Sequence, residues 1–295
     1  MAHIIKNFDE ISTQYKAIFC DLWGCIHNGK ESFTNSLKAL LKYKKNGGVV
    51  ILLTNAPRPA NIITKFIEQL GITKNHYDDI VTSGDAAQLS LFTGTYGQNI
   101  YHIGPERDLC FFDINSALLE NPVNINLVNI AEANCIVCTG LFNDLVEAPD
   151  DYRHIVKNGI IRNLKFLCIN PDIQVDFGHK RLWCAGSLAS SYTQAGGTSV
   201  YFGKPHKPIY DLALKKLHVI SPLIQASEVI CVGDGMLTDI VGGNSYGLDT
   251  LFVCGGLAGI ETGVITESDS PSDQKLTKFF LNAGLQPTAS IGQFR

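Results

Sequence analysis

Short runs of apolar, β-prone residues recur along the chain, and between them lie stretches in which apolar positions follow helical spacing. Each run is continuous and flanked by Gly, Asn or Asp, which is typical of strands buried on both faces of a sheet. The pattern therefore predicts nine strands, at residues 17–21, 48–54, 79–83, 99–103, 135–139, 164–170, 198–203, 228–234 and 249–255.

Two of the intervening stretches carry clear helix signals. Residues 36–47 end in Gly after a basic last turn, and residues 208–219 begin with Pro and keep apolar residues at helical spacing. The tail 286–295 has no periodic pattern, so we expect a loop there. The alternation of strands and helices predicts an α/β fold built from parallel βαβ units, in which sites lie beyond the carboxyl ends of the strands.

Composition narrows the class of protein. The 295 residues are 45% hydrophobic, enough for two domains with real cores. The net charge is −4 and no basic run occurs, which disfavours a nucleic-acid partner. No apolar run approaches the roughly 20 residues that span a bilayer, and the N-terminus lacks the apolar stretch of a secretion signal. We therefore expect a cytoplasmic protein without a membrane partner.

The nine cysteines mostly fall within the apolar runs, where they act as small buried hydrophobes in a reducing compartment. Cys135 and Cys138 have the CxxC spacing of metal and redox sites. Their run is a predicted strand, however, and a strand points residues three apart to opposite faces. The interpretation as a buried strand is therefore favoured over a metal or redox site.

Polar groups follow four of the predicted strands, which we expect to belong to one sheet. They are Asp21, Thr54, Lys204 and Asp234. Taken singly, each has an ordinary explanation as a turn carboxylate, a helix cap, a solvated lysine or a polar loop. Together they supply what phosphoryl transfer needs: a nucleophile in Asp21, a Mg²⁺ ligand in Asp234, and groups that bind phosphoryl oxygens in Thr54 and Lys204.

The order of these motifs resembles the haloacid dehalogenase superfamily, and more narrowly its class IIA, with the NagD-like and p-nitrophenyl-phosphatase-like members. The matching stretches span residues 21–247 in the family's order: DLWGCIHNG, VVILLTNAPRP, VTSGDAA, CINPD, GKPHKPIY and VGDGMLTDIVGGNSYG. The resemblance implies a Mg²⁺-dependent phosphoric monoester hydrolase that forms an aspartyl phosphate. Its substrate would be a small phosphorylated metabolite such as a sugar phosphate or a nucleotide.

The resemblance also assigns residues. It makes Asp21 the nucleophile and a Mg²⁺ ligand, and it implies that Thr54 and Asn55 bind the phosphoryl group. Lys204 would neutralise that group and orient Asp21.

For the metal, the resemblance makes Asp234 the second carboxylate ligand, with Asp239 supporting it directly or through a water. The third protein ligand would be the backbone carbonyl of Trp23, a role that any side chain allows.

Trp23 departs from the family pattern, because phosphatases of this superfamily usually have a second Asp there as general acid and base. An indole cannot exchange that proton, and losing a general acid–base costs about 10²–10⁴-fold in rate. Turnover is then slow or limited to leaving groups that need no proton, or His27 substitutes, or the protein binds its ligand without hydrolysing it. His27 can also be interpreted as a surface or turn histidine beside Asn28, and this interpretation is favoured.

A second domain follows from spacing. Thr54 and Lys204 are 150 residues apart, whereas a simple βαβ return needs about 30. The inserted part has its own strand–helix alternation. With the class IIA resemblance, this predicts a doubly wound, Rossmann-like parallel-sheet core at 1–94 and 198–295 and an inserted α/β cap at 95–197. Related caps often dimerise, so a homodimer through the cap is an open alternative.

Two further residues are candidates for substrate binding. Arg58 follows the Thr54 motif, where its guanidinium could pair with a second phosphate or carboxylate, or could be a solvated helix-start arginine. Asp172 follows the Asn170-Pro171 exit of a cap strand, where it could line the cleft or cap a turn. The alternative function is a catalytically weak phosphometabolite-binding protein. A carbon–halogen hydrolase fits less well, because Lys204 and Asp234 together suit phosphate and Mg²⁺.

Overall fold

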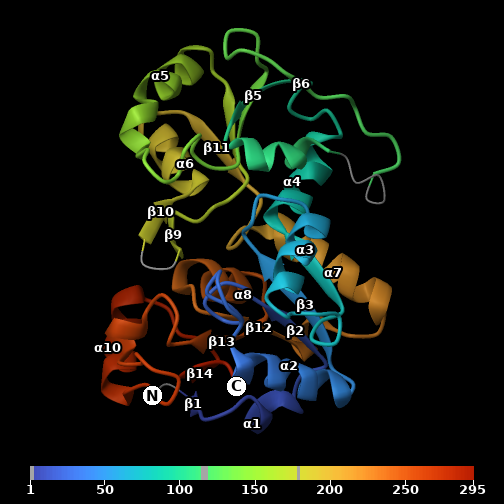
Figure 1. Ribbon diagram of the computed structural model, residues 1–295, viewed down its shortest axis with the longest axis vertical. Coiled ribbons are helices and arrows are strands. Elements are labelled where there is room, and N and C mark those ends of the chain that lie inside the picture. The colour runs from blue at the N-terminus through green and yellow to red at the C-terminus, as the bar shows by residue number, and fades with distance from the viewer. Residues whose placement is uncertain (1–2, 114–118, 178–179) are drawn as a thin grey trace. The chain divides into compact units, whose positions relative to one another are not determined.

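The computed structural model describes residues 3–113, 119–177 and 180–295 and divides the chain into two compact units (Figure 1). The first unit comprises Met1–Thr54, Thr64–Val81 and Tyr210–Arg295. The second unit comprises Asn55–Ile63 and Thr82–Ile209, so it is inserted into the sequence of the first. Each unit has its own sheet and its own buried core.

A seven-stranded sheet forms the centre of the first unit. Its strands β2, β3 and β12 are buried along their whole length, as expected of continuous apolar runs inside a parallel sheet. The pairs from β1 to β3 in the strand order are all parallel. In that order the strands are β1 (Ile4–Ile5), β14 (Ala289–Ile291), β13 (Asp249–Val253), β12 (Val229–Gly233), β2 (Ala17–Cys20), β3 (Val49–Thr54) and β4 (Asp79–Thr82).

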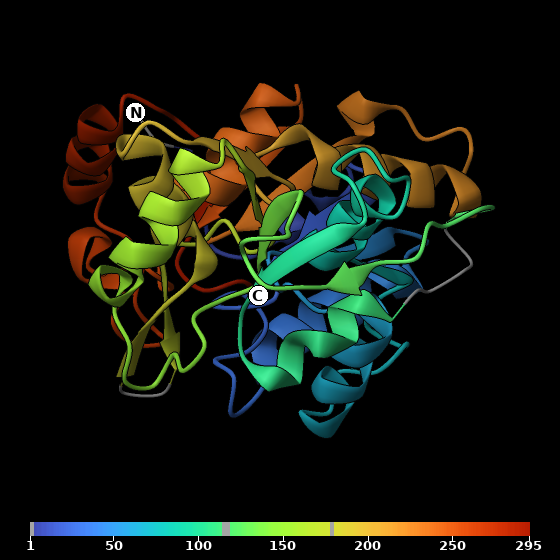
Figure 2. The same ribbon diagram turned by 90° about the horizontal axis from the view of Figure 1, so that it is seen from above.

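Helices flank this sheet. The predicted helix at 36–47 is α2, which ends in three lysines, and Gly47 follows in the left-handed conformation with φ 90°. The C-terminal helix α10, red in Figures 1 and 2, packs on β13 through Phe279 and Phe280 against Phe252. The helical segments that lie or end in the first unit are α1 (Asp9–Ser12), α2 (Thr34–Lys45), α3 (Ala60–Gln69), α7 (Lys207–Ile220), η4 (Ala226–Glu228), the π-helical turn η5 (Met236–Ile240), α8 (Val241–Ser245), α9 (Gly259–Thr262) and α10 (Asp273–Ala283).

The second unit has a five-stranded parallel sheet and a short antiparallel pair. The sheet order is β11 (Thr198–Tyr201), β8 (Lys165–Cys168), β7 (Cys135–Cys138), β5 (Asn99–Ile103) and β6 (Asn126–Leu127). The antiparallel pair is β9 (Gln174–Phe177) with β10 (Lys180–Trp183). The helices are α4 (Ser83–Leu91), η1 (Glu106–Phe112), η3 (Pro149–Tyr152), α5 (Arg153–Ile161) and α6 (Ala185–Gln194).

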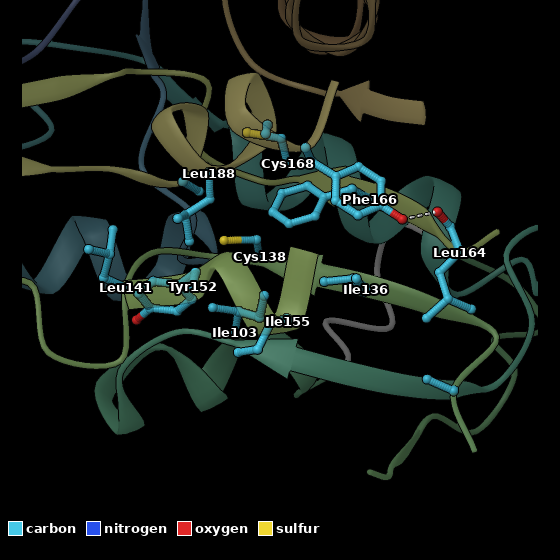
Figure 3. Packing of buried hydrophobic residues seen from close by; sticks show 14 residues of the cluster. Ile103, Ile136, Cys138, Leu141, Tyr152, Ile155, Leu164, Phe166, Cys168 and Leu188 are labelled. Atoms are coloured by element: carbon cyan, nitrogen blue, oxygen red, sulfur yellow. Dashed lines mark hydrogen bonds between the residues drawn. The ribbon is translucent and has the colours of Figure 1, made fainter. Parts of the chain in front are cut away.

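The core of the second unit lies between its sheet and helices α5 and α6 (Figure 3). Alternate residues of β7 face this core, with Ile136 and Cys138 packed beside Leu188 of α6, while Cys135 is buried outside the cluster. Burial raises the pKa of both β7 thiols. The interpretation of the CxxC run as a buried strand is therefore confirmed.

All nine predicted strands are present, but two expectations about the chain are wrong. The tail is not a loop throughout, because Ala289–Ile291 form the buried strand β14 between β1 and β13. The strand before Lys204 does not share a sheet with β2, β3 and β12, because β11 pairs with β8 in the second unit. The predicted cap boundaries at 95 and 197 stay a prediction. Over the part of the chain that the structure describes, no helix combines the length and apolarity needed to cross a bilayer.

Candidate functional site

The first unit brings two carboxylates together at the ends of neighbouring strands. Asp21 follows β2 and Asp234 follows β12, and the register pairs Cys20 with Val232. The backbone N–H of Asp21 donates to the carbonyl of Val232 at 2.8 Å, which continues the ladder to Asp21. Both carboxylates are buried. The third strand end is Thr54 on β3, the other neighbour of β2, so the first unit gathers three of the four predicted strand-end groups.

Cys25 joins this pair, although no motif in the sequence marks it. The potential ligand atoms of Asp21, Cys25 and Asp234 all lie within 4.8 Å of one another. Burial, followed by the charges of Asp234 and Asp21, raises the pKa of the Cys25 thiol well above its usual value. A protonated thiol is a poor ligand, whereas carboxylate oxygens are the ligands that hard cations prefer. The donor set therefore fits Mg²⁺ through the two aspartates.

Two glycines leave room for Asp234. A Cβ on Gly24 would lie 2.1 Å from Asp234 Oδ2, and one on Gly256 would lie 2.0 Å from the same atom. Gly24 also adopts φ 78°, which favours glycine. The N–H of Leu257 donates to Asp234 Oδ2 at 2.9 Å. The backbone therefore packs closely around the Asp234 carboxylate, and residues 24 and 256 must be glycine for this packing.

Asp239 lies in η5 and turns its carboxylate toward its own loop. Its Oδ2 accepts from the N–H of Gly235 at 3.1 Å and from the hydroxyl of Thr238 at 3.3 Å. Among the described residues, the group of potential metal ligands contains Asp234 and not Asp239. These contacts favour the indirect form of the predicted role, in which Asp239 shapes the turn that carries Asp234.

His27 is buried in the segment that follows Asp21. Its Nδ1 accepts from the N–H of Gly29 at 3.0 Å, and its ring lies edge-on to Trp23 at 5.1 Å and to Phe66 at 5.8 Å between centroids. Burial lowers the pKa of His27 to about 4, so the ring is uncharged at neutral pH. A neutral histidine with one ring nitrogen already hydrogen-bonded is what we expect of a structural turn residue, the alternative interpretation of His27. The acid–base role stays a prediction that this environment disfavours.

The second unit contains the remaining predicted residues. The side-chain amide of Asn55 donates to Asp172 Oδ1 at 2.8 Å and to the carbonyl of Lys204 at 3.1 Å, and its Oδ1 accepts from the N–H of Lys204 at 2.7 Å. A Cβ on Gly203 would lie 2.4 Å from Asn55 Oδ1. Asn55 therefore joins the segments after β8 and β11, and Asp172 is tied to the Lys204 loop through it.

Arg58 lies against a carboxylate that the sequence did not mark. Its Nε is 3.6 Å from Asp108 Oδ1, and the side chains are 31% and 5% exposed, respectively. Asp108 belongs to η1, 50 positions along the chain from Arg58, so no local pattern could have paired them. Arg58 is thus not a simple solvated arginine.

The backbone around Arg58 is held by the start of α4. The N–H of Gly84 donates to the carbonyl of Ala56 at 3.1 Å, and Asp85 Oδ1 accepts from the N–H of Ala60 at 3.1 Å. A Cβ on Gly84 would lie 2.3 Å from the carbonyl oxygen of Pro57. The VTSGDAA stretch therefore has a structural task, which is to fix the segment that follows Thr54.

A parallel α/β sheet with paired buried carboxylates beyond adjacent strands defines an α/β enzyme whose centre is built at the strand ends. Two family patterns match the chain, "haloacid dehalogenase-like hydrolase" at residues 18–113 and "HAD-hydrolase-like" at 201–270. A solved haloacid dehalogenase-like hydrolase from Brucella suis is 37% identical over 99% of this chain and 100% of that chain, with a TM-score of 0.85. The chain belongs to the haloacid dehalogenase-like hydrolase family, as the motifs predicted.

Other proteins are similar at lower identity. An acid sugar phosphatase from Staphylococcus aureus is 26% identical over 251 residues, which cover 84% of this chain and 90% of that protein. A p-nitrophenyl phosphatase from Archaeoglobus fulgidus shares the fold at 17% identity, with a TM-score of 0.70 over 95% of this chain and 96% of that one. The likeness to the Archaeoglobus fulgidus protein concerns the fold alone.

Proposed function

We propose that this hydrolase is a Mg²⁺-dependent phosphatase of a small phosphate monoester, a sugar phosphate or a nucleotide-like compound, acting through an aspartyl phosphate on Asp21. The observation that carries the proposal is the pair of buried carboxylates, Asp21 and Asp234, at the ends of adjacent strands. The similarity to an acid sugar phosphatase supports the substrate class.

The metal proposal rests on charge. Two carboxylates this close repel each other strongly in a buried setting unless a cation or a proton intervenes. Asp21, Asp234 and the backbone carbonyl of Trp23 would hold Mg²⁺, and Asp239 would support them from its turn or through a water. A bound Mg²⁺ offsets the negative charge of the phosphoryl group, which otherwise repels an anionic nucleophile.

The protein's own groups then perform two displacements. The carboxylate of Asp21 attacks phosphorus, a bond forms between its oxygen and phosphorus, and the ester oxygen leaves with the bonding electrons. Water next attacks the aspartyl phosphate, which releases inorganic phosphate and restores Asp21. Thr54 and Lys204 would bind the phosphoryl oxygens as charge develops. Asn55 would also bind the phosphoryl group, and its hydrogen bonds to Lys204 would hold the Lys204 loop in place.

Proton transfer is the weak point of this scheme. The leaving oxygen needs a proton, and Trp23 provides no titrating group at the family's usual position. We therefore propose turnover that is slow by about 10²–10⁴-fold or confined to good leaving groups. His27 as the substitute acid and base remains a hypothesis that its low pKa and its bond from Gly29 disfavour.

The proposal also covers organisation and partners. We propose a cap at 95–197 inserted between core segments 1–94 and 198–295, and a small phosphorylated metabolite as the partner. A homodimer through the cap stays a hypothesis. The nine free thiols suit a reducing compartment, so we propose the cytoplasm as the place of action.

Phosphate release from a panel of sugar phosphates, nucleotides and p-nitrophenyl phosphate tests this function. We expect release that requires Mg²⁺ and that falls to background in Asp21→Asn. The control is Asp9→Asn, which changes a half-exposed aspartate of the first unit. Binding of panel compounds without release above the Asp21→Asn background would refute the phosphatase and support the alternative that Trp23 suggests, a catalytically weak phosphometabolite-binding protein.

A further inference from the structure

We propose that Arg58, positioned by Asp108, binds a second anionic group of the substrate, so that the preferred substrate is a phosphate monoester that also carries a carboxylate or a second phosphate. This inference rests on the proposed function and narrows its substrate class.

Arg58 lies close in the chain to the proposed phosphate-binding group. Asn55, which is hydrogen-bonded to Lys204 within the second unit, precedes it by three residues. A three-residue span places the two Cα atoms at most about 11 Å apart. A small metabolite can therefore reach Arg58 with one end while its phosphoryl group lies at Asn55 and Lys204.

The backbone on both sides of Arg58 is fixed. Gly84 binds the carbonyl of Ala56, and Asp85 binds the N–H of Ala60, so the segment is held at residues two before and two after the arginine. Fixing the backbone lowers the entropic cost of presenting a long side chain to a ligand. An arginine used only for solubility would need no such support.

Asp108 is fixed as well, at the carboxyl ends of β5 and β7. Its N–H donates to the carbonyl of Pro105 at 2.9 Å. Burial raises the pKa of Asp108, and the charges of Arg58 and Arg107 together with a hydrogen bond from Thr139 partly offset that rise. Thr139 Oγ1 lies 2.9 Å from His102 Nε2, so the hydroxyl can donate to Asp108 while it accepts from the ring.

Gly104 permits this arrangement, because a Cβ there would lie 2.0 Å from Thr139 Oγ1 and 2.7 Å from His102 Nε2. The end of β5 thus approaches the end of β7 closely enough to enclose the Asp108 carboxylate. The carboxyl ends of parallel strands are where α/β units bind their ligands.

The accessible member of the pair is the arginine. Asp108 is 5% exposed, whereas Arg58 is 31% exposed. At 3.6 Å the pair is an ion pair without a hydrogen bond, and among the described residues Arg58 Nε has no hydrogen-bond partner. A guanidinium has five donors in a planar fork that matches carboxylate and phosphate oxygens. Asp108 therefore orients the fork from one side and leaves donors for an anion.

Two matched substrate pairs test the proposal. Glycerol 3-phosphate is compared with 3-phosphoglycerate, which adds a carboxylate, and fructose 6-phosphate with fructose 1,6-bisphosphate, which adds a phosphate. We expect kcat/KM to favour the more anionic member of at least one pair about tenfold to a hundredfold, the range of a hydrogen-bonded charge pair. The pair that shows the preference identifies which anion the site takes.

Variants separate recognition from packing. Arg58→Gln should bring that preference to near one, and Arg58→Lys should retain only part of it. Asp108→Asn should raise KM for the more anionic substrate with little change in kcat, because a positioning residue acts through Arg58. Arg153→Gln is the control, since Arg153 is an exposed arginine of the same unit paired with an exposed aspartate. Thermal unfolding of each variant reports whether it is folded.

The outcomes are distinct. A wild-type preference near one for both pairs overturns the inference without any variant, and so does a preference that Arg58→Gln and Arg153→Gln retain equally. If no ester is hydrolysed, the proposed function fails on its own. The inference is then tested by calorimetric binding of the same four compounds to Asp21→Asn, where equal affinities within both pairs would overturn it.

Discussion

Replacing Gly24 with alanine should damage the proposed metal site through a single methyl group. Gly24 has φ 78°, a conformation that costs an alanine about 1–2 kcal/mol. The new Cβ would lie 2.1 Å from Asp234 Oδ2 and 2.7 Å from Asp234 Cγ, where ordinary contacts begin near 3.4 Å. The carboxylate must therefore move by more than about 1 Å, which also strains its bond from the N–H of Leu257.

Gly71→Ala is the matched control. Gly71 has φ 80°, and its Cβ would meet no atom within 4 Å, so it carries the same backbone cost without the clash. Both variants should lose about 1–2 kcal/mol of unfolding free energy through the backbone conformation alone. Only Gly24→Ala should also lose Mg²⁺ affinity, by about 10- to 100-fold, the range seen when the support of a metal ligand is removed.

The measurement is a Mg²⁺ titration of each variant by calorimetry, with the Mg²⁺ dependence of the unfolding temperature as a second readout. The comparison with Gly71→Ala removes any general effect of lower stability. If Gly24→Ala binds Mg²⁺ as tightly as Gly71→Ala, then Asp234 is not a metal ligand and the proposed site is wrong.

Three other predictions address proton transfer, pH and thiol accessibility. Trp23→Asp should speed hydrolysis of alkyl phosphates by up to about 10²-fold relative to p-nitrophenyl phosphate. Trp23→Asn, which loses the same packing, should not. Equal rates of alkyl phosphate hydrolysis in the two variants would show that another group supplies the proton. Burial lowers the pKa of His102 from 6.5 to about 4, so the unfolded chain binds the proton at a higher pH than the folded protein does. The contribution of His102 to the free energy of unfolding is complete above pH 6.5 and falls by about 3 kcal/mol toward pH 4. Urea unfolding at pH 7 and pH 4 should show a smaller decline in His102→Gln, and an unchanged decline would refute the assignment. Native thiol labelling should modify Cys110 first, because the other eight cysteines are buried, and a fast phase that survives Cys110→Ser would contradict this burial pattern.

Hydrophobic pattern predicted the strands well because each run is long enough to show it. The run 48–54 is buried at every position from Val49 to Thr54, as a central parallel strand must be. β14 was missed because three residues, one of them Ser290, are too few to show a period. The sheet to which β11 belongs was also predicted wrongly, because an apolar run indicates that a strand is buried but does not indicate which strand it pairs with.

The site residues also fall into those that local sequence patterns predicted and those that they did not. The expectation that Asp21 and Asp234 belong to one site followed from the rule that sites of a parallel sheet lie beyond the carboxyl ends of its strands. The structure adds that β2 and β12 are neighbours. Cys25 and Asp108 could not be found this way. Each acts through a tertiary contact, with Asp234 for the thiol and with Arg58 for the carboxylate, and neither contact leaves a local pattern in the sequence.

Trp23 is more than a missing aspartate, because the turn after Asp21 is packed around it. A Cβ on Gly29 would lie 2.4 Å from the indole, and the His27 ring lies edge-on to the same indole. That packing keeps His27 buried, and burial is what lowers its pKa to about 4. Trp23 thus takes the place of the family's usual general acid, and its packing also keeps His27 uncharged at neutral pH. In the proposed mechanism the proton for the leaving oxygen would come from water or from the substrate itself, so leaving groups that need no proton should be the best substrates.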